Sequence, residues 1–194
     1  MKIIFAQGNP GAEYEQSRHN IGFIVLDTIA KNNAATFLNK SKFHAMIAET
    51  NLAAEKVLLV KPTTFYNETG KSLRTIMDFY KVDINDVLVV HDELVLPFGK
   101  IRIRHSGRDA GNNGIKSLNA HIGENYTRLR IGVYNERRDR MHDADFVLGK
   151  LSQAERNELE KYILPKISEL ITTFANHTLA DDSFSLLPKI EQEK

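Results

Sequence analysis

Short apolar runs alternate with helix-patterned segments along most of the chain, and this alternation constrains the fold more than any other feature. The strand-like runs are KIIFAQ at 2–7, KFHAMIAET at 42–50, EKVLLVKP at 55–62, DVLVVHDE at 86–93, GKIRIRHS at 99–106 and RLRIGVY at 128–134. Between them lie segments with apolar residues three and four positions apart, such as Leu73, Ile76, Met77 and Tyr80. Strands interleaved with helices predict a single α/β domain over residues 1–194, with a mixed, mostly parallel twisted sheet flanked by helices.

Helix signals occur at both ends of the chain. Ser17 is a candidate cap for a helix in which Ile21, Val25 and Ile29 share one face. Ser152 and Glu155 have the spacing of a capping box, and Pro165 is expected to break or kink the helical region that follows. We therefore expect a helical segment over 152–180, with a lid as its candidate role, and a loosely held tail from residue 183.

Composition excludes several kinds of protein. The chain has no cysteine, which excludes disulfides, thiolate metal sites and cysteine nucleophiles. No apolar run approaches the roughly 20 residues of a membrane span. The opening MKIIFAQGNP is too short for a signal peptide, which predicts a cytoplasmic protein. The net charge is +1, so nucleic-acid binding would have to come from local basic patches.

Polar residues stand where three of the predicted strands end. Asn9 follows the first strand, Asn67 follows the segment KVLLVKPTTFY, and Asp92 ends VLVVHD. Ligands of open α/β sheets bind outside the carboxyl ends of the strands, so these residues predict one crevice. Each also has a simpler interpretation: Asn9-Pro10-Gly11 as a turn, Asn67 as a helix cap, and Asp92 as a residue that holds a loop.

His19 is the histidine best placed for chemistry, because it stands beside this strand-end cluster. A histidine that acts as a general base needs a partner that fixes its tautomer and stabilises the imidazolium, and Asp92 is the natural candidate. His91 precedes Asp92, so it is expected on the opposite face of the strand as a structural residue. A His–Asp pair without serine or cysteine would activate water, with asparagines stabilising a developing oxyanion.

Other motifs are incomplete. TGKSL at 69–73 resembles the end of a phosphate-binding loop, but the glycine that the loop requires is replaced by Phe65. MHDAD at 141–145 contains metal-capable residues without a second ligand cluster, and a solvated loop is the better interpretation. A nucleotide-binding α/β domain is therefore a weak alternative.

Four separated motifs in the same order closely resemble the bacterial peptidyl-tRNA hydrolase family. They are GNPGAEYEQSRHNIGF at 8–23, VKPTTFYNETGKSL at 60–73, VVHDELVLPFGKIRIR at 89–104 and GNNGIKSL at 111–118, with RLRIGV and DFVLGKLS as further matching blocks. The resemblance implies an α/β fold, a monomer, and hydrolysis of the ester between a peptide and its tRNA without a cofactor. Such an enzyme recycles tRNA from prematurely released peptidyl-tRNA.

The resemblance also assigns roles to individual residues. His19 would be the general base, Asp92 the acid that keeps it basic, and Asn9 the residue that separates blocked from free aminoacyl-tRNA. The contacts to the aminoacyl group and the 3′ end of the tRNA would be Tyr14, Phe65, Asn67 and Asn113. Arg102 and Arg104 would form a basic clamp for the 5′ phosphate. The chain departs from the family pattern at Gln7, Tyr66, Asn112 and the segment 134–140.

Two alternatives stay open. Strict alternation in KIRIR at 100–104 places Lys100, Arg102 and Arg104 on one face, which also suits the solvated face of an edge strand. The main rival function is that of a non-catalytic RNA-binding relative with the same fold. The simultaneous presence of His19, Asp92 and the three asparagines argues against that rival.

Overall fold

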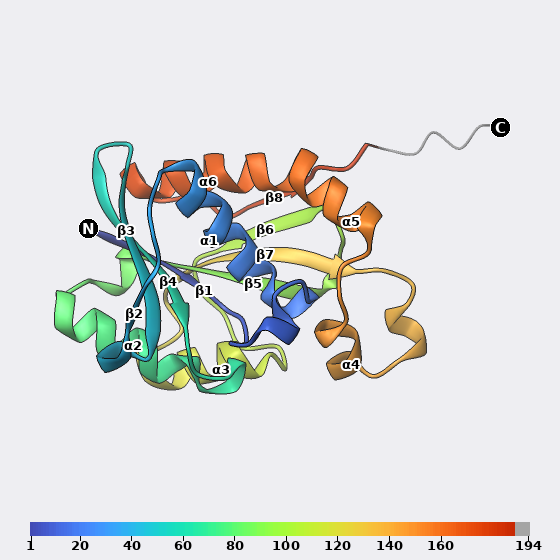
Figure 1. The fold of residues 1–194 in the computed structure, drawn as a ribbon, viewed down its shortest axis with the longest axis horizontal. Coiled ribbons are helices and arrows are strands. Elements are labelled where there is room, and N and C mark those ends of the chain that lie inside the picture. The colour runs from blue at the N-terminus through green and yellow to red at the C-terminus, as the bar shows by residue number, and fades with distance from the viewer. Residues whose placement is uncertain (189–194) are drawn as a thin grey trace.

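The computed structural model describes residues 1–188 and contains an eight-stranded sheet with helices on both faces (Figure 1). The strands are β1 (Lys2–Ala6), β2 (Leu38–Lys40), β3 (Ala45–Leu52), β4 (Glu55–Pro62), β5 (Val87–Pro97), β6 (Lys100–Arg104), β7 (Thr127–Tyr134) and β8 (Asp182–Ser185). The helices are α1 (Ile21–Asn32), α2 (Thr69–Tyr80), α3 (Asn113–Ile122), α4 (Asp143–Leu148), α5 (Gln153–Glu158) and α6 (Leu164–Asn176). This architecture confirms the predicted single α/β domain.

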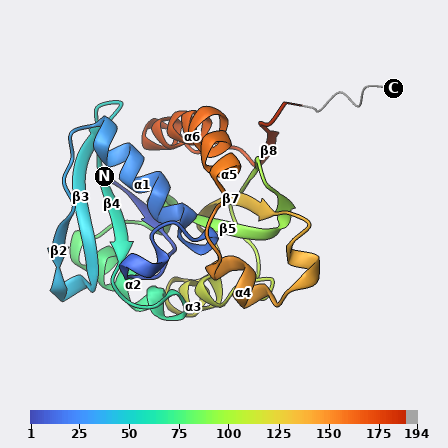
Figure 2. The same ribbon diagram turned by 45° about the vertical axis from the view of Figure 1, so that its right-hand side comes forward.

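The strand order is β2-β3-β4-β1-β5-β7-β6-β8, with β2 and β8 at opposite edges (Figure 2). Parallel pairing is confined to the centre, where β4, β1, β5 and β7 lie side by side. The outer pairs β2–β3, β3–β4, β7–β6 and β6–β8 are antiparallel. The sheet is therefore mixed, as predicted, with less parallel pairing than expected. Its parallel centre gathers the carboxyl ends of β4, β1 and β5 at one edge.

Two apolar cores fill the two faces of the sheet, because successive side chains of a strand point to opposite sides. In β1, Ile4 packs with the core under α1 and α6, whereas Ile3 and Phe5 pack with the core under α2 and α3. Figure 1 shows these helix pairs above and below the sheet. Burial on both faces explains why β1 and the start of β5 are continuous apolar runs.

The helical segment after Ser152 begins with the predicted capping box, in which Ser152 and Glu155 bond reciprocally. A π-helical turn over Leu159–Ile163 joins α5 to α6, and Pro165 lies in the first turn of α6. Proline has no N–H to donate to the preceding turn, and the helical region changes from a π-helical to an α-helical turn at this point without ending. The lid role of residues 152–180 stays a prediction. The burial of the apolar side chains of this segment favours a helical layer fixed against the sheet instead. The buried apolar residues are Leu159, Ile163, Leu164, Ile167, Leu170, Ile171, Phe174, Ala175 and Leu179.

The structure corrects two expectations about the edges of the sheet. β6 is not an edge strand, because β8 pairs with its outer side and joins Arg102 to Ser183 in register. The expectation of a loose tail is therefore wrong for residues 183–185, while its last part, 189–194, lies outside the described residues. The predicted solvated loop at 141–145 is partly wrong as well, since α4 begins at Asp143.

Candidate active site

A cavity of about 620 Å³ opens at the carboxyl ends of the central parallel strands. Its lining includes six of the predicted residues: Asn9, His19, Phe65, Asn67, Asp92 and Asn113. These residues come from the segments after β1 and β4, from β5 and from the start of α3. The predicted single crevice is confirmed, and it has the location that ligands prefer in open α/β sheets.

His19 lies in a 3₁₀ turn, Arg18–Asn20, which we call the His19 turn. On one side, Asn20 holds Asn9 by two bonds: its Oδ1 accepts the Asn9 backbone N–H at 2.8 Å, and its Nδ2 donates to the Asn9 carbonyl at 2.9 Å. Gly22 follows, and a Cβ there would lie 2.7 Å from the Val90 carbonyl oxygen. Glycine thus allows α1 to begin directly against the sheet. The prediction that Ser17 caps this helix is wrong, because Asn20 is the cap residue.

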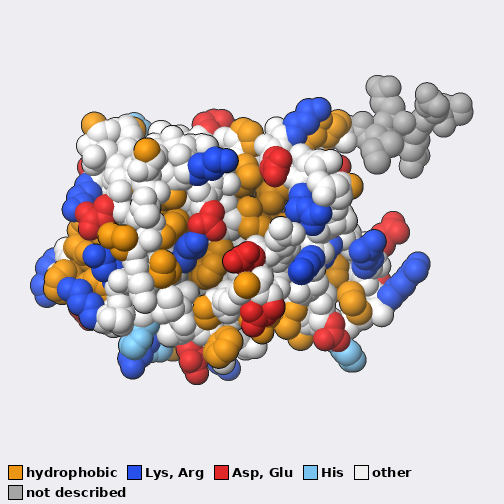
Figure 3. All heavy atoms as spheres, in the orientation of Figure 1, with side chains coloured by type: hydrophobic (Ala, Val, Ile, Leu, Met, Phe, Trp, Pro, Cys, Tyr) orange, Lys and Arg blue, Asp and Glu red, His pale blue; other side chains and the backbone are white. Residues whose placement is uncertain are grey.

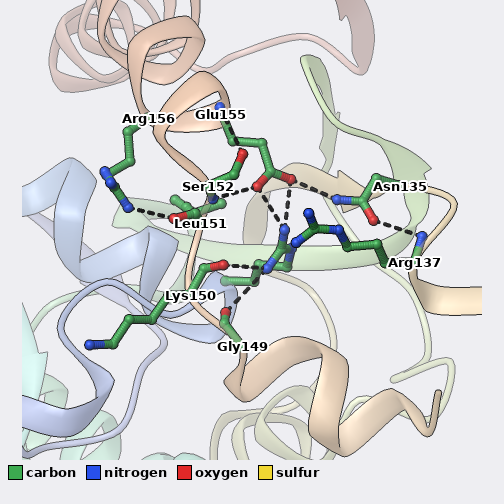
Figure 4. A network of polar contacts seen from close by, with 9 residues as sticks. Asn135, Arg137, Gly149, Lys150, Leu151, Ser152, Glu155 and Arg156 are labelled. Atoms are coloured by element: carbon green, nitrogen blue, oxygen red, sulfur yellow. Dashed lines mark hydrogen bonds and ion pairs between the residues drawn. The ribbon is translucent and has the colours of Figure 1, made fainter.

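The other side of the His19 turn is anchored by a buried ion pair (Figure 4). The Arg18 guanidinium donates to both carboxylate oxygens of Glu155 at 2.7 Å, and to the carbonyls of Gly149 and Lys150. Glu155 also accepts from Asn135 Nδ2 at 2.7 Å and from the Ser152 backbone N–H. The capping box of α5 is therefore tied to the turn that carries His19.

His19 and Asp92 form the predicted pair, with 2.9 Å between His19 Nδ1 and Asp92 Oδ2. Asp92 is 2% exposed and the His19 side chain 16%. Burial alone would raise the pKa of the Asp92 carboxyl, but the charge and hydrogen bond of His19 outweigh it, and the pKa lies below its usual 3.8. Because a carboxylate only accepts, Nδ1 carries the proton and Nε2 is the basic nitrogen.

The Asn9 side chain has a fixed orientation. Its Oδ1 accepts the backbone N–H of Tyr66 at 2.8 Å. The carbonyl end of the amide is therefore committed to the protein, and the NH₂ end is available to a ligand. The site thus presents a base at His19 and a neutral hydrogen-bond donor at Asn9.

The residues predicted to contact the aminoacyl group and the tRNA end differ in their position relative to the cavity. Phe65 is 58% exposed at the rim, and Asn67 and Asn113 are exposed residues of the lining. Tyr14 lies in the 3₁₀ turn Ala12–Tyr14 and is absent from the lining of the cavity. The structure therefore brings together every predicted residue of this cluster except Tyr14.

A second cavity, of about 660 Å³, has more basic than acidic lining residues and adjoins the first, since both are lined by Glu93, Asp109 and Ala110. Its arginines are Arg104, Arg108, Arg128 and Arg130. Arg102 belongs to the same face of the sheet, because it pairs with Arg130 in register, but it is absent from the lining. Basic and acidic side chains are interspersed on the face drawn in Figure 3, in agreement with a net charge of +1. We call this second cavity the basic pocket.

His91 lines the basic pocket, on the face of β5 opposite to Asp92, as predicted. Its Nδ1 lies 2.7 Å from the backbone carbonyl of Asp92, and burial lowers its pKa to about 4. His91 is therefore neutral near pH 7, in agreement with a structural role.

Several residues of the site were not singled out from the sequence. The sequence indicates only a strand at Arg128 and Arg130, although their spacing of two residues places both on one face of it. No spacing pattern identifies Arg18 or Asn20, because their hydrogen-bond partners are either far away in the sequence or backbone groups. Tyr66 differs from the family pattern, and the sequence gives no further sign of its place in the site.

A larger cavity, of about 1100 Å³, lies between α1 and the α5–α6 region and meets the first one at Asn9. We call it the α1–α6 groove. It contains neither His19 nor Asp92, so its size does not make it the reactive centre. Asn9 thus stands at the boundary between the groove and the candidate active site.

Residues 1–188 contain neither a metal-ligand cluster nor a membrane-spanning helix. No group of three or more histidine, aspartate or glutamate side chains there is arranged to hold a metal ion. No helix in the same range combines the length and apolar character needed to cross a membrane.

Comparison with known proteins gives consistent results. A family model described as peptidyl-tRNA hydrolase matches residues 3–192. A peptidyl-tRNA hydrolase of Leuconostoc mesenteroides is 44% identical over 161 residues, covering 82% of this chain and 85% of the relative. One of Lactiplantibacillus plantarum is 40% identical over 186 residues, covering 95% and 96%. The crystal structure of peptidyl-tRNA hydrolase from Acinetobacter baumannii superposes with a TM-score of 0.82 at 31% identity, covering 90% of this chain and 88% of that one.

Proposed function

The chain belongs to the peptidyl-tRNA hydrolase family, and on that premise we propose that it hydrolyses peptidyl-tRNA with a water molecule activated by His19. The observation that supports this most is the His19–Asp92 pair, 2.9 Å apart, at the wall of a cavity at the carboxyl ends of the central strands. Family membership supports the reaction, and the geometry supports the assignment of roles.

In the proposed mechanism, His19 Nε2 accepts a proton from water while the water oxygen attacks the carbonyl carbon of the ester. Asp92 stabilises the imidazolium that forms, which is why its carboxylate must stay ionised. The tetrahedral intermediate then collapses, the bond to the ribose oxygen breaks, and the imidazolium returns its proton to that oxygen. The products are a peptide with a free carboxylate and tRNA with a free terminal hydroxyl.

The asparagines supply neutral hydrogen bonds in this scheme. The free NH₂ group of Asn9 suits the amide carbonyl of an N-blocked substrate, which an unblocked aminoacyl group lacks. Asn67 and Asn113, exposed in the lining, are positioned to contact the ester carbonyl and the end of the tRNA. Amide donors aimed at a developing oxyanion stabilise it without a net charge of their own.

We assign the basic pocket to a phosphate of the tRNA. The family resemblance assigns a clamp for the 5′ phosphate to Arg102 and Arg104. We keep Arg104 in this role, because it lines the pocket, and add Arg130, which also lines it and lies on the neighbouring strand. The residues shared by the two cavities support one continuous surface for the tRNA. Arginine binds phosphate through two parallel hydrogen bonds, so this residue type suits the task.

We assign the α1–α6 groove to the peptide. A substrate whose first amide carbonyl bonds Asn9 would direct the rest of its peptide past Asn9, where the groove begins. The groove has both acidic and basic lining residues, including Glu15, Asp27, Lys31 and Arg156, which suits peptides of varied sequence. A monomer in the cytoplasm also belongs to the proposal, and light scattering would test its oligomeric state.

The test is the release of free tRNA from N-acetylated aminoacyl-tRNA by the purified protein. We expect turnover without added metal. A protein that binds the substrate tightly and releases no tRNA would instead support the RNA-binding alternative.

A further inference from the structure

Tyr66 contacts both members of the proposed catalytic pair. Its ring stacks on the His19 imidazole, with 3.5 Å between ring centroids and 15° between planes. Its hydroxyl donates to Asp92 Oδ1 at 2.8 Å, while Asp92 Oδ2 binds His19. One side chain therefore touches the imidazole and occupies the second oxygen of its carboxylate partner.

The direction of the hydrogen bonds at the Tyr66 hydroxyl follows from Asn112. Asn112 caps α3, where its Oδ1 accepts the Ile115 backbone N–H at 3.0 Å. Its Nδ2 can only donate, and it donates to the Tyr66 hydroxyl oxygen at 3.1 Å. The hydroxyl hydrogen of Tyr66 is thereby directed to Asp92. The result is a chain of bonds from Asn112 through Tyr66 and Asp92 to His19.

The Tyr66 ring is held rigidly. It is 5% exposed, and its backbone N–H is bonded to Asn9. The ring also packs against Gly114 of α3, where a Cβ would come within 2.3 Å of it. Glycine at 114 thus gives the ring the space it occupies.

Burial, followed by the charge of Asp92, raises the pKa of the Tyr66 hydroxyl well above 10.0. Tyr66 therefore remains a hydrogen-bond donor throughout the pH range in which histidine titrates. Other ionisable groups also face the pair, and any pH effect must be separated from theirs. They are His91 and Glu93 on β5, Asp109 before α3, and Arg138 and Asp143 near α4.

We propose that Tyr66, supported by Asn112, is a positioning residue that holds the plane of the His19 ring and the orientation of the Asp92 carboxylate. This inference rests on the proposed function of His19 and Asp92. Stacking limits rotation of the imidazole, and the bond to Oδ1 keeps Oδ2 directed at Nδ1. The same bond withdraws negative charge from Asp92, and so moderates how strongly the carboxylate favours the protonated form of His19.

The test compares the wild type with Tyr66→Phe, which keeps the ring and loses the hydroxyl. We expect kcat for N-acetylated aminoacyl-tRNA to fall roughly tenfold with KM little changed, because a hydrogen bond to a charged group is lost. We also expect the acid limb of the pH profile of kcat/KM to move to higher pH, because the Asp92 carboxylate no longer shares its charge with the Tyr66 hydroxyl and stabilises the imidazolium more strongly. Tyr66→Met, which loses the ring as well, should be slower still.

Two further variants make the result specific. Asn112→Ser keeps an α3 cap but cannot reach Tyr66, so it should produce a smaller shift of the acid limb in the same direction. Tyr126→Phe is the matched control: Tyr126 is 1% exposed, and its hydroxyl donates to Asn119 Oδ1 at 2.8 Å, outside the active-site cavity. It should lower Tm without altering kcat or the pH profile.

A folded Tyr66→Phe protein with wild-type kcat and an unchanged pH profile would overturn the proposal. If Tyr66→Phe does not fold, an unchanged profile in Asn112→Ser would overturn it in the same way. Failure of the proposed function gives a different result, because His19→Ala would then keep its activity. Loss of activity in His19→Ala together with an unaffected Tyr66→Phe would contradict this inference alone.

Discussion

Replacing Glu155 by Gln removes the negative partner of Arg18, a residue that is 3% exposed. Breaking a buried pair from one side costs about 3–5 kcal/mol, because the remaining charge is left buried without compensation. Gln keeps only one acceptor oxygen, whereas the Ser152 backbone N–H and Asn135 Nδ2 bind different oxygens of Glu155, so one of these two donors also loses its partner and we expect a loss of about 4 kcal/mol. For a domain of this size that corresponds to a fall in Tm of roughly 10 °C.

Urea unfolding followed by circular dichroism would measure this loss, with Glu169→Gln as the control. Glu169 pairs with Lys166 at 2.7 Å, but its side chain is 63% exposed, so its replacement should cost under about 1 kcal/mol. The double variant Arg18→Met with Glu155→Met should recover much of the loss, because no unpaired charge remains. A loss in Glu155→Gln no larger than that of the control would refute the buried-pair argument.

The same pair predicts a pH dependence of stability. Burial tends to raise the pKa of Glu155, but its bonds from Ser152 and the charge of Arg18 outweigh this, and the net pKa is lowered below 4.5. A lowered folded-state pKa gives stability that is present above the unfolded value and is lost as pH falls through the folded value. The wild type should therefore lose stability below about pH 4, and this part of the loss should be absent in Glu155→Gln.

Three further predictions concern the substrate. Asn9→Asp should narrow the preference for N-acetylated over free aminoacyl-tRNA, because a carboxylate attracts the free ammonium; an unchanged ratio of kcat/KM would contradict the role of Asn9. Replacing both Arg104 and Arg130 with Gln should raise KM for whole tRNA substrates and flatten its rise with salt, since fewer counterions are released, while a minimal substrate without a 5′ phosphate is unaffected. Thr28→Trp should fill part of the α1–α6 groove and slow hydrolysis of tRNA substrates with long peptides more than that of N-acetylated aminoacyl-tRNA. Equal effects on the two substrates would contradict the assignment of the groove to the peptide.

The parts of the fold that the sequence predicts best are those where local pattern and burial agree. The run around Ile3, Ile4 and Phe5 is apolar on both faces, and it forms the central strand β1. β8 has the opposite character: its sequence DSFS is polar, and it becomes a strand only because it pairs with β6. Such a strand depends on a tertiary contact, which a local pattern does not contain.

The same distinction applies to the site. Asn9 and Asp92 were predicted to converge because the end of a parallel strand has a known place in an α/β sheet. Arg130 required the register of β6 with β7, which places it opposite Arg102. The role of Tyr66 depends on side-chain contacts with Asp92 and Asn112, which are remote in the chain and invisible to periodicity.

Single-turnover hydrolysis of N-acetylated aminoacyl-tRNA by the wild type and by His19→Ala tests the central claim most directly, because it isolates the chemical step from product release. Loss of a general base should reduce the single-turnover rate at least about 100-fold. The circular dichroism spectrum should be unchanged, whereas Tm should fall, since His19→Ala removes the stacking on Tyr66 and leaves the buried Asp92 carboxylate with the Tyr66 hydroxyl as its partner. A folded His19→Ala protein that cleaves the ester at a rate near that of the wild type would contradict activation of water by His19.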